Sequence, residues 1–179
     1  MAARDLLSFP NPVNERAARV VAAGALVQAL AFVITRQGWL LVPLTYGFVA
    51  RVLTGPKLSP LGQLATRVVA PRLPWPAVYV PGPPKRFAQA IGAVLTIAAS
   101  VTWLAGGQLG AVVLVSLLVV AASLESIFAI CLGCTIFGWL IRAGVVPDSV
   151  CVACNDLSLR PSGPAAERIV RPSTSAASS

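Results

Sequence analysis

The sequence predicts an all-α integral membrane protein with four transmembrane helices, arranged as two hairpins, and an amphipathic interfacial helix between spans two and three. Of the 179 residues, 56% are hydrophobic and only 11% are charged, whereas soluble domains carry roughly 25% charged residues. Apolar runs close to the roughly 20 residues that a span requires recur along the chain. The chain has no histidine, which excludes histidine-dependent catalytic triads and histidine-ligated metals.

Four apolar segments are the predicted spans: residues 18–35, 38–54, 87–105 and 109–130. The first two are separated only by Arg36-Gln37-Gly38, so we expect an antiparallel hairpin. Gly106, Gly107 and Gln108 turn the second hairpin. The fourth segment has a helical extension to residue 142. At 1.5 Å per residue it measures about 50 Å, more than the roughly 30 Å hydrocarbon core. It must therefore tilt, kink, or leave the membrane and follow the interface.

The basic residues indicate the orientation. They fall before span one, between spans two and three, and after span four; these are Arg16, Arg19, Arg51, Lys57, Arg67, Arg72, Lys85, Arg86 and Arg142. The remaining two connections carry only Arg36. Because basic loops stay inside, we expect an inner-membrane protein with both termini in the cytoplasm. The net charge of +8 suits contact with anionic lipid, and no basic stripe with interleaved aromatics predicts nucleic-acid binding.

The segment between spans two and three contains the predicted interfacial helix. Apolar residues recur there at helical spacing, namely Leu61, Leu64, Ala65, Val68 and Val69. Pro60 suits the first turn of a helix, and Pro71 is expected to stop it. Two domains follow: a membrane domain over residues 1–156, and a polar tail over residues 157–179 that we expect to be disordered and cytoplasmic.

A weak internal repeat precedes spans one and three. PNPVNERAARVVAAG resembles PGPPKRFAQAIGAV, each a proline-rich stretch followed by a basic residue and a helix of small apolar residues. This similarity is compatible with a duplicated hairpin, and equally with two proline-capped basic entries to a span that are alike by chance.

All four cysteines lie in two C-x-x-C pairs, Cys131 with Cys134 and Cys151 with Cys154. In a regular helix the first two point about 60° apart, on one face. Four thiolates can hold a structural zinc or iron. Each pair can alternatively cycle between dithiol and disulfide, or pass sulfur. Cysteine also packs well in apolar interiors, although two such pairs make chance a poor explanation.

Glu125 lies inside the fourth apolar segment, where a carboxylate marks either function or a buried partner. On a regular helix it points roughly 120° to 180° away from the cysteines, so it reaches them only if the helix kinks. The alternative to a functional role is a pairing with Arg51 or another inward-facing basic group.

Three stretches resemble a known family. They are YGFVARVLTGPKLSPLGQLATRVVAPRL, PKRFAQAIGAVLTIA and LESIFAICLGCTIFGWLIRAG, and they resemble domain of unknown function 4395, a family of small bacterial membrane proteins common in actinobacteria. The resemblance runs from Asn11 to about Gly144 and is most specific over Leu124 to Cys134. It implies four spans, a cysteine pair at a helix end, and genes near thioredoxin-like and sulfurtransferase proteins. Cys151 and Cys154 are not matched to this pattern.

Our leading hypothesis is thiol redox or sulfur transfer with a soluble thioredoxin-like or sulfurtransferase partner. Cys131 and Cys134 form the membrane-proximal pair, Cys151 and Cys154 a relay or resolving pair, and Glu125 handles protons. A second hypothesis is a non-catalytic subunit of a larger membrane complex, or a homo-oligomer, with zinc or iron on all four cysteines. A third is a small transporter of a sulfur-containing solute with Glu125 in its path.

Overall fold

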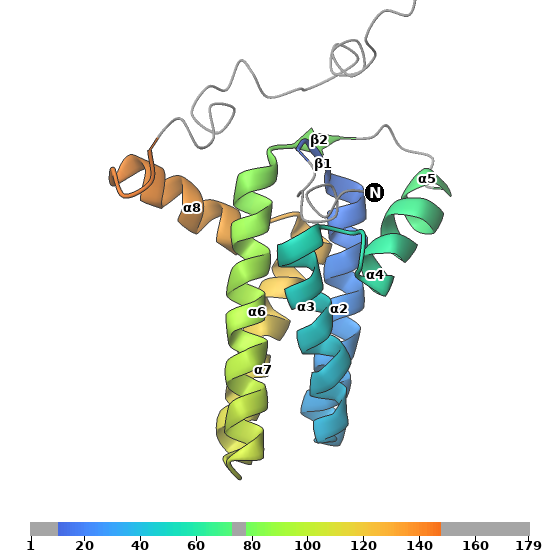
Figure 1. Ribbon diagram of the computed structural model, residues 1–179, viewed down its shortest axis with the longest axis vertical. Helices are drawn as coiled ribbons and strands as arrows, with labels where there is room; N and C mark the ends of the chain where they lie inside the picture. Colours follow the sequence, from blue (N-terminus) through green and yellow to red (C-terminus); the bar gives the residue numbers. More distant parts are fainter. Residues whose placement is uncertain (1–10, 73–77, 148–179) are drawn as a thin grey trace, which may run out of the picture.

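The computed structural model describes residues 11–72 and 78–147, which form a bundle of four long helices with shorter elements at one end (Figure 1). The bundle helices are α2 (Glu15–Thr35), α3 (Leu41–Thr54), α6 (Gly82–Leu104) and α7 (Gln108–Phe128). A short 3-10 turn, η1 (Gly38–Leu40), leads into α3. The starts of α2 and α6 and the ends of α3 and α7 lie at the same end of the bundle.

The two predicted hairpins pack chiefly on one another. Helix α2 lies mainly against α7, α3 mainly against α6, and α6 also packs along α7, whereas α2 and α3 touch little. The core between them is apolar and includes Phe32, Leu44 and Val115, each at most 1% exposed. Small residues such as Ala29, Ala99 and Ala111 are fully buried and let the helices approach closely.

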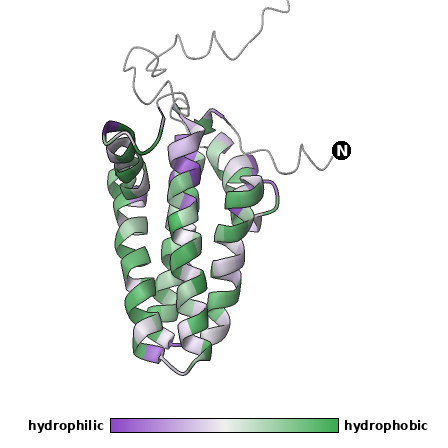
Figure 2. Cartoon of the chain, turned by 60° about the vertical axis from the view of Figure 1, so that its left-hand side comes forward, coloured by the Kyte–Doolittle hydropathy of each residue, from purple (hydrophilic) through white to green (hydrophobic). Residues whose placement is uncertain are grey.

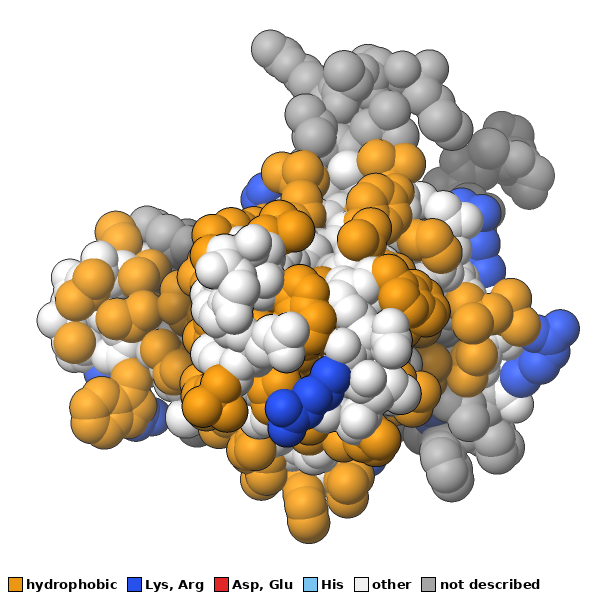
Figure 3. Space-filling model, turned by 90° about the horizontal axis from the view of Figure 1, so that it is seen from below, with side chains coloured by type: hydrophobic (Ala, Val, Ile, Leu, Met, Phe, Trp, Pro, Cys, Tyr) orange, Lys and Arg blue, Asp and Glu red, His pale blue; other side chains and the backbone are white. Residues whose placement is uncertain are grey.

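Three helices in the described part of the chain are long and apolar enough to cross a membrane, namely α2, α6 and α7. The fourth, from Gly38 to Thr54, is shorter, about 25 Å at 1.5 Å per residue. Hydrophobic residues run along the length of the bundle helices, and hydrophilic residues gather mainly at the end with the shorter elements (Figure 2). Many of the large hydrophobic side chains are exposed. The opposite end shows mainly hydrophobic and uncharged side chains (Figure 3).

A helical segment is present where the interfacial helix is predicted. It consists of α4 (Pro60–Gln63), a π-helical turn η2 (Leu64–Val69) and α5 (Ala70–Arg72). Its N-cap is Ser59, whose side chain accepts a hydrogen bond from the Gly62 amide at 3.2 Å. Leu61 packs against Gly24 of α2, and Leu64 and Val68 are exposed. The segment thus has one apolar face on the bundle and further apolar side chains outside.

The internal repeat corresponds to a structural pair. Strand β1 (Val13–Asn14) pairs antiparallel with β2 (Tyr79–Val80), and each strand directly precedes a long helix, α2 or α6 (Figure 1). Asn14 also caps α2, because its side chain accepts a hydrogen bond from the Arg16 amide at 3.0 Å. The two stretches therefore meet at one end of the bundle, where each leads into a long helix.

The fourth apolar segment is not one helix. Helix α7 ends at Phe128, and a separate helix, α8 (Leu132–Arg142), runs sideways beside the start of α6 (Figure 1). The break has a local cause: Ala129 adopts a left-handed conformation with φ 58°, and the Ile130 amide donates back to the Leu124 carbonyl at 3.1 Å, a Schellman-type helix end. Helix therefore extends to residue 142, but as a separate helix after a break, and of the alternatives for this segment the structure has the kink.

A basic side chain from another helix closes the end of α7. Arg19 of α2 donates to the carbonyl oxygens of Ser126 and Ile127, both at 3.1 Å from its Nη2 atom. These are carbonyls that a helix end leaves without an intrahelical partner. Arg19 thus replaces the hydrogen bonds that a continuing helix would supply. The predicted disordered tail, residues 157–179, lies outside the described residues.

Candidate functional site

The first cysteine pair lies at the start of α8. Cys131 is the N-cap residue, and its sulfur accepts a hydrogen bond from the Cys134 amide at 3.3 Å. Both are free thiols; Cys131 is 8% exposed and Cys134 is partly exposed. The two cysteines were expected on one face of a continuous helix. Cys131 instead caps α8 and Cys134 lies in its first turn, and this arrangement still keeps the two residues together.

Gly133 sets how closely this turn approaches the bundle. A Cβ atom at Gly133 would lie 2.5 Å from the Ala88 Cα atom, so the backbone of α8 rests directly on α6. Further along α8, the Phe137 ring packs against Phe87 of α6, with ring centroids 5.5 Å apart. These two contacts fix the position of the cysteine pair relative to α6.

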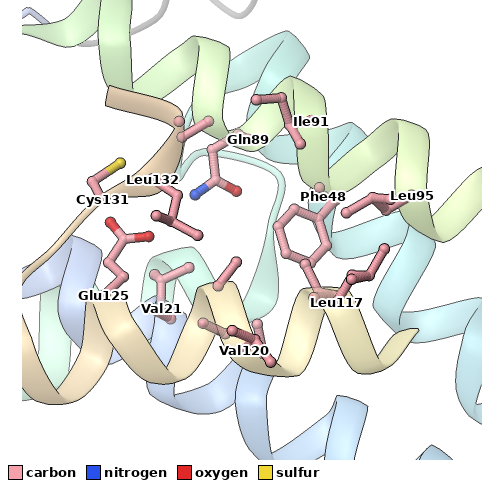
Figure 4. A pocket seen from close by; sticks show the side chains of 18 of the residues that line it. Val21, Phe48, Gln89, Ile91, Leu95, Leu117, Val120, Glu125, Cys131 and Leu132 are labelled. Carbon is pink, nitrogen blue, oxygen red and sulfur yellow. The ribbon is translucent and has the colours of Figure 1, made fainter. Parts of the chain in front are cut away.

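Glu125 is held by an ion pair within the bundle. Its Oε1 atom lies 2.7 Å from Nζ of Lys85, and the two side chains are 14% and 10% exposed. The partner is therefore an inward-facing basic residue, as one alternative held, although it is Lys85 and not Arg51. Because the chain breaks after Phe128 instead of continuing as one helix, Glu125 and Cys131 share the wall of one cavity (Figure 4).

The two thiols have different proton affinities. A hydrogen bond from the Cys134 thiol lowers the pKa of Cys131, with a further lowering from the positive charge of Lys85, against the opposing effects of burial and Glu125. The same hydrogen bond raises the pKa of Cys134, and burial adds to that rise. Cys131 is therefore the sulfur that ionises first.

Arg51 forms a second polar group beside the cavity. Its Nε atom donates to Oε1 of Gln89 at 2.8 Å, and its Nη1 atom donates to Oγ of Ser59 at 3.2 Å. The guanidinium carbon lies 4.5 Å from the centre of the Phe48 ring. Arg51 is only 5% exposed, so a positive charge lies inside the bundle. Arg51 and Glu125 both line the cavity.

Lys85 and Gln89 were not predicted as site residues. They stand one turn apart near the start of α6, and positions i and i+4 share a helix face. In the sequence, Lys85 reads as one more basic residue before a span. Only the packing of α6 against α7 shows that it points inward.

A cavity of about 300 Å³ lies between the bundle helices and the start of α8. Its buried lining includes residues of α2, α3, α6 and α7, while its exposed lining residues come from α7 and α8. Figure 4 shows Cys131 and Glu125 close together at one end, with the Gln89 amide group and the Phe48 ring further along. Most of the remaining lining is aliphatic.

Cys151 and Cys154 lie outside the described residues. Only two of the four ligands of the predicted metal site, Cys131 and Cys134, are therefore described. Within residues 11–72 and 78–147, no group of three or more histidine, cysteine or acidic side chains is placed to hold a metal ion. The described thiol pair with Glu125 and Lys85 is thus a polar cluster with an adjoining apolar cavity.

Comparison with known proteins identifies a family. No curated protein and no solved structure matches the chain. Residues 13–142 match the family described as Domain of unknown function (DUF4395), a range that starts at β1 and ends at the last residue of α8. The match includes the helix break, Cys131, Cys134, Lys85 and Glu125. The chain therefore belongs to the DUF4395 family.

Proposed function

We propose that this chain is a membrane thiol oxidoreductase that exchanges disulfides with a soluble thioredoxin-like partner through Cys131 and Cys134. The observation that carries the proposal is the hydrogen-bonded thiol pair at the start of α8, at the end of the bundle where hydrophilic residues gather. A lowered thiol pKa beside a second cysteine is the usual property of redox-active C-x-x-C pairs.

The different exposure of the two cysteine residues supports different roles for them. Cys134 is partly exposed and Cys131 is buried, so an attacking partner thiolate meets the Cys134 sulfur of the oxidised pair. The Cys131–Cys134 bond breaks, a mixed disulfide forms on Cys134, and Cys131 leaves as the thiolate. A leaving thiol of lower pKa departs faster. A second partner thiolate then displaces Cys134, which leaves the partner oxidised and this pair reduced.

Lys85 and Glu125 support this exchange by their charges. Lys85 lowers the pKa of Cys131, and Glu125 opposes it. The pair thus holds one positive and one negative charge near the leaving sulfur. Cys151 and Cys154 provide a second route in this proposal: a thiolate of that pair attacks Cys134 in place of the partner thiolate, and the disulfide that the pair then forms is passed to the partner.

We also propose four spans in the inner membrane, with the thiol end in the cytoplasm. The helix from Gly38 to Thr54 is short for a span, and a bilayer accommodates such a mismatch at modest cost. The basic ends of α2 and α6 lie at the thiol end, which supports its placement inside. Maleimide labelling of Gln37→Cys and Lys57→Cys in a cysteine-free chain tests this. Labelling from the same side contradicts it.

The exchange is tested by trapping the mixed disulfide. A thioredoxin that retains only its attacking cysteine, activated as a mixed disulfide with thionitrobenzoate, is mixed with the reduced chain. We expect the Cys131→Ser variant to accumulate a stable adduct on Cys134, and the Cys134→Ser variant to form far less. Equal adduct in both variants would contradict the assigned roles.

The Cys151→Ser/Cys154→Ser double variant serves as the matched control, because it keeps the described pair and removes the other. Cys131 remains in this variant and resolves a mixed disulfide on Cys134, so we expect no adduct to accumulate. Adding Cys131→Ser to this background should restore the adduct, which separates Cys134 from Cys151 and Cys154 as its site. Metal analysis of the parent chain, purified anaerobically with all four cysteines, tests the scaffold alternative. One zinc or iron per chain, with all four thiols protected from alkylation, would replace the redox proposal with a structural metal site.

A further inference from the structure

The cavity beside Cys131 opens on the outer surface of the bundle. Its inner wall includes buried residues of α2 and α3, such as Ala25 and Phe48, whereas four aliphatic residues on its rim are exposed. These are Leu117 and Val120 of α7 with Leu132 and Ile136 of α8. Exposed aliphatic residues on helices of this hydropathy face lipid. A molecule dissolved in the bilayer can therefore enter from the side.

The polar groups of the cavity gather at one end. Cys131 and Glu125 lie there, and the Gln89 amide and Arg51 guanidinium follow. The rest of the lining is aliphatic apart from the Phe48 ring. Such a site, apolar with few convergent polar groups, is typical of small-molecule pockets, whose volumes run from roughly 300 Å³. It suits a flat apolar head group with a polar atom at its edge.

We propose that the cavity binds a lipid-soluble quinone, which reoxidises the Cys131–Cys134 pair. The inference deepens the proposed function and rests on it: each exchange with a soluble dithiol leaves the pair reduced, so turnover requires an electron acceptor. Cys131 is buried and lines the cavity, whereas Cys134 is partly exposed and does not line it. The two partners thus meet different sulfurs.

The reaction balances as a two-electron transfer. Two S–H bonds break, one S–S bond forms between Cys131 and Cys134, and the quinone gains two electrons and two protons to become a quinol. One proton comes from Cys134 and the other is the proton that Cys131 releases on ionising. The amide of Gln89 is placed to donate to a quinone carbonyl oxygen, and the charges of Arg51 and Lys85 favour electron density on it.

The experiment uses the full chain in lipid nanodiscs, with Cys151→Ser and Cys154→Ser so that only one pair reports. The reduced protein is mixed anaerobically with decyl-ubiquinone, whose fully substituted ring leaves no free position for thiol addition. We expect one quinol per chain, and a protein mass lower by two hydrogen atoms. Failure to form quinol, while oxidised glutathione still oxidises the pair, would overturn the inference and leave the proposed function intact.

Blocking the cavity mouth tests the location. Val120→Trp places a large side chain on the rim, and we expect quinol formation to slow by about tenfold, equivalent to about 1.4 kcal/mol. Val113→Trp is the matched control, because Val113 is similarly exposed two turns away on the same helix and does not line the cavity. Equal quinol rates in both variants would place the reaction outside the cavity and overturn the inference.

Two further measurements separate the remaining outcomes. The rate of oxidation by glutathione disulfide reports on folding and on access to Cys134, and it should be unchanged in Val120→Trp. Ile136→Trp, on the α8 side of the cavity, should slow quinol formation as Val120→Trp does. Quinol formation without disulfide exchange to thioredoxin would support the cavity and refute the soluble partner. A bound lipid seen by native mass spectrometry, with no quinol formed, would assign the cavity to a structural lipid instead.

Discussion

The Lys85 ammonium and the Glu125 carboxylate lie 2.7 Å apart, and this ion pair joins α6 to α7. Both charges act on the thiol of Cys131. Both side chains are largely removed from solvent. Charged groups at such depth are costly unless they are paired. The pair therefore stabilises the helix contact that places Cys131 beside the cavity, and it also sets the electrostatic potential at the thiol.

Removing either charge should destabilise the bundle. In Lys85→Met or Glu125→Gln the remaining partner stays buried, and we expect a loss of about 3 kcal/mol in the free energy of unfolding. The double variant should lose less than the sum of the two, because neither charge is then left alone. Denaturant titration in detergent measures all three. Strict additivity would mean that the two groups do not interact.

The same two variants should move the reactivity of Cys131 in opposite directions. Glu125 raises the pKa of Cys131 and Lys85 lowers it. At a pH below that pKa, Glu125→Gln should therefore increase the thiolate fraction and the rate of alkylation, and Lys85→Met should decrease both. The pH profile of iodoacetamide labelling, in the Cys151→Ser/Cys154→Ser background, measures the shift. A shift of the same sign in both variants would indicate structural disturbance alone.

The hydrogen bond from Cys134 can be tested separately from its redox role. Because this bond is the largest cause of the lowered pKa of Cys131, Cys134→Ala should raise that pKa. Cys134→Ser retains a donor hydroxyl and should raise it less. Iodoacetamide labelling of Cys131 across pH distinguishes the two variants. Identical profiles would show that the thiol of Cys134 does not act on Cys131.

Much of the fold follows from hydropathy. Hydrophobic segments mark α2, α6 and α7 because a helix must present apolar residues on all sides to lipid. Ser59 and Pro60 mark the start of α4, because serine is a favourable N-cap residue and the first turn of a helix accommodates proline. Helical turns are present over this segment, although Pro71 lies within α5 and not after it.

The site was only partly predictable, because it depends on one unusual residue and on packing. An alanine with positive φ ends α7. The sequence around Ala129 has no glycine or proline that would indicate a helix end there. Once α7 ends there, Cys131 becomes a cap and comes into the same cavity wall as Glu125. The cysteines and Glu125 were recognisable from residue type, whereas Lys85 and Gln89 required the contact between helices.

Gly133 should be needed for the docking of α8. In Gly133→Ala the new Cβ atom meets the Ala88 backbone at 2.5 Å, so α8 must move away from α6 and expose Cys131. We expect faster alkylation of Cys131 and a lower thermal stability. Gly138→Ala is the matched control on the same helix, because a Cβ there meets nothing within 4 Å. It should stabilise by up to about 1 kcal/mol through helix propensity alone.

Ala129 carries the strain that breaks the fourth apolar segment. Its φ of 58° lies in the left-handed region, where a residue with a Cβ atom costs about 1 kcal/mol or more. Ala129→Gly should therefore increase the free energy of unfolding by about 1 kcal/mol, and Ala129→Val should lower it, since a β-branched residue fits that region poorly.

Ala143 supplies the control for that comparison. It caps α8 with a right-handed φ of −77°, so Ala143→Gly relieves no strain and should be neutral or destabilising. Denaturant titration of the three variants checks the signs, and alkylation of Cys131 should stay at the parent rate in Ala129→Gly, because the turn is kept. If Ala129→Gly instead loses stability, glycine's added freedom outweighs the relief, and the break must be maintained by Arg19 and the contacts of α8 with α6.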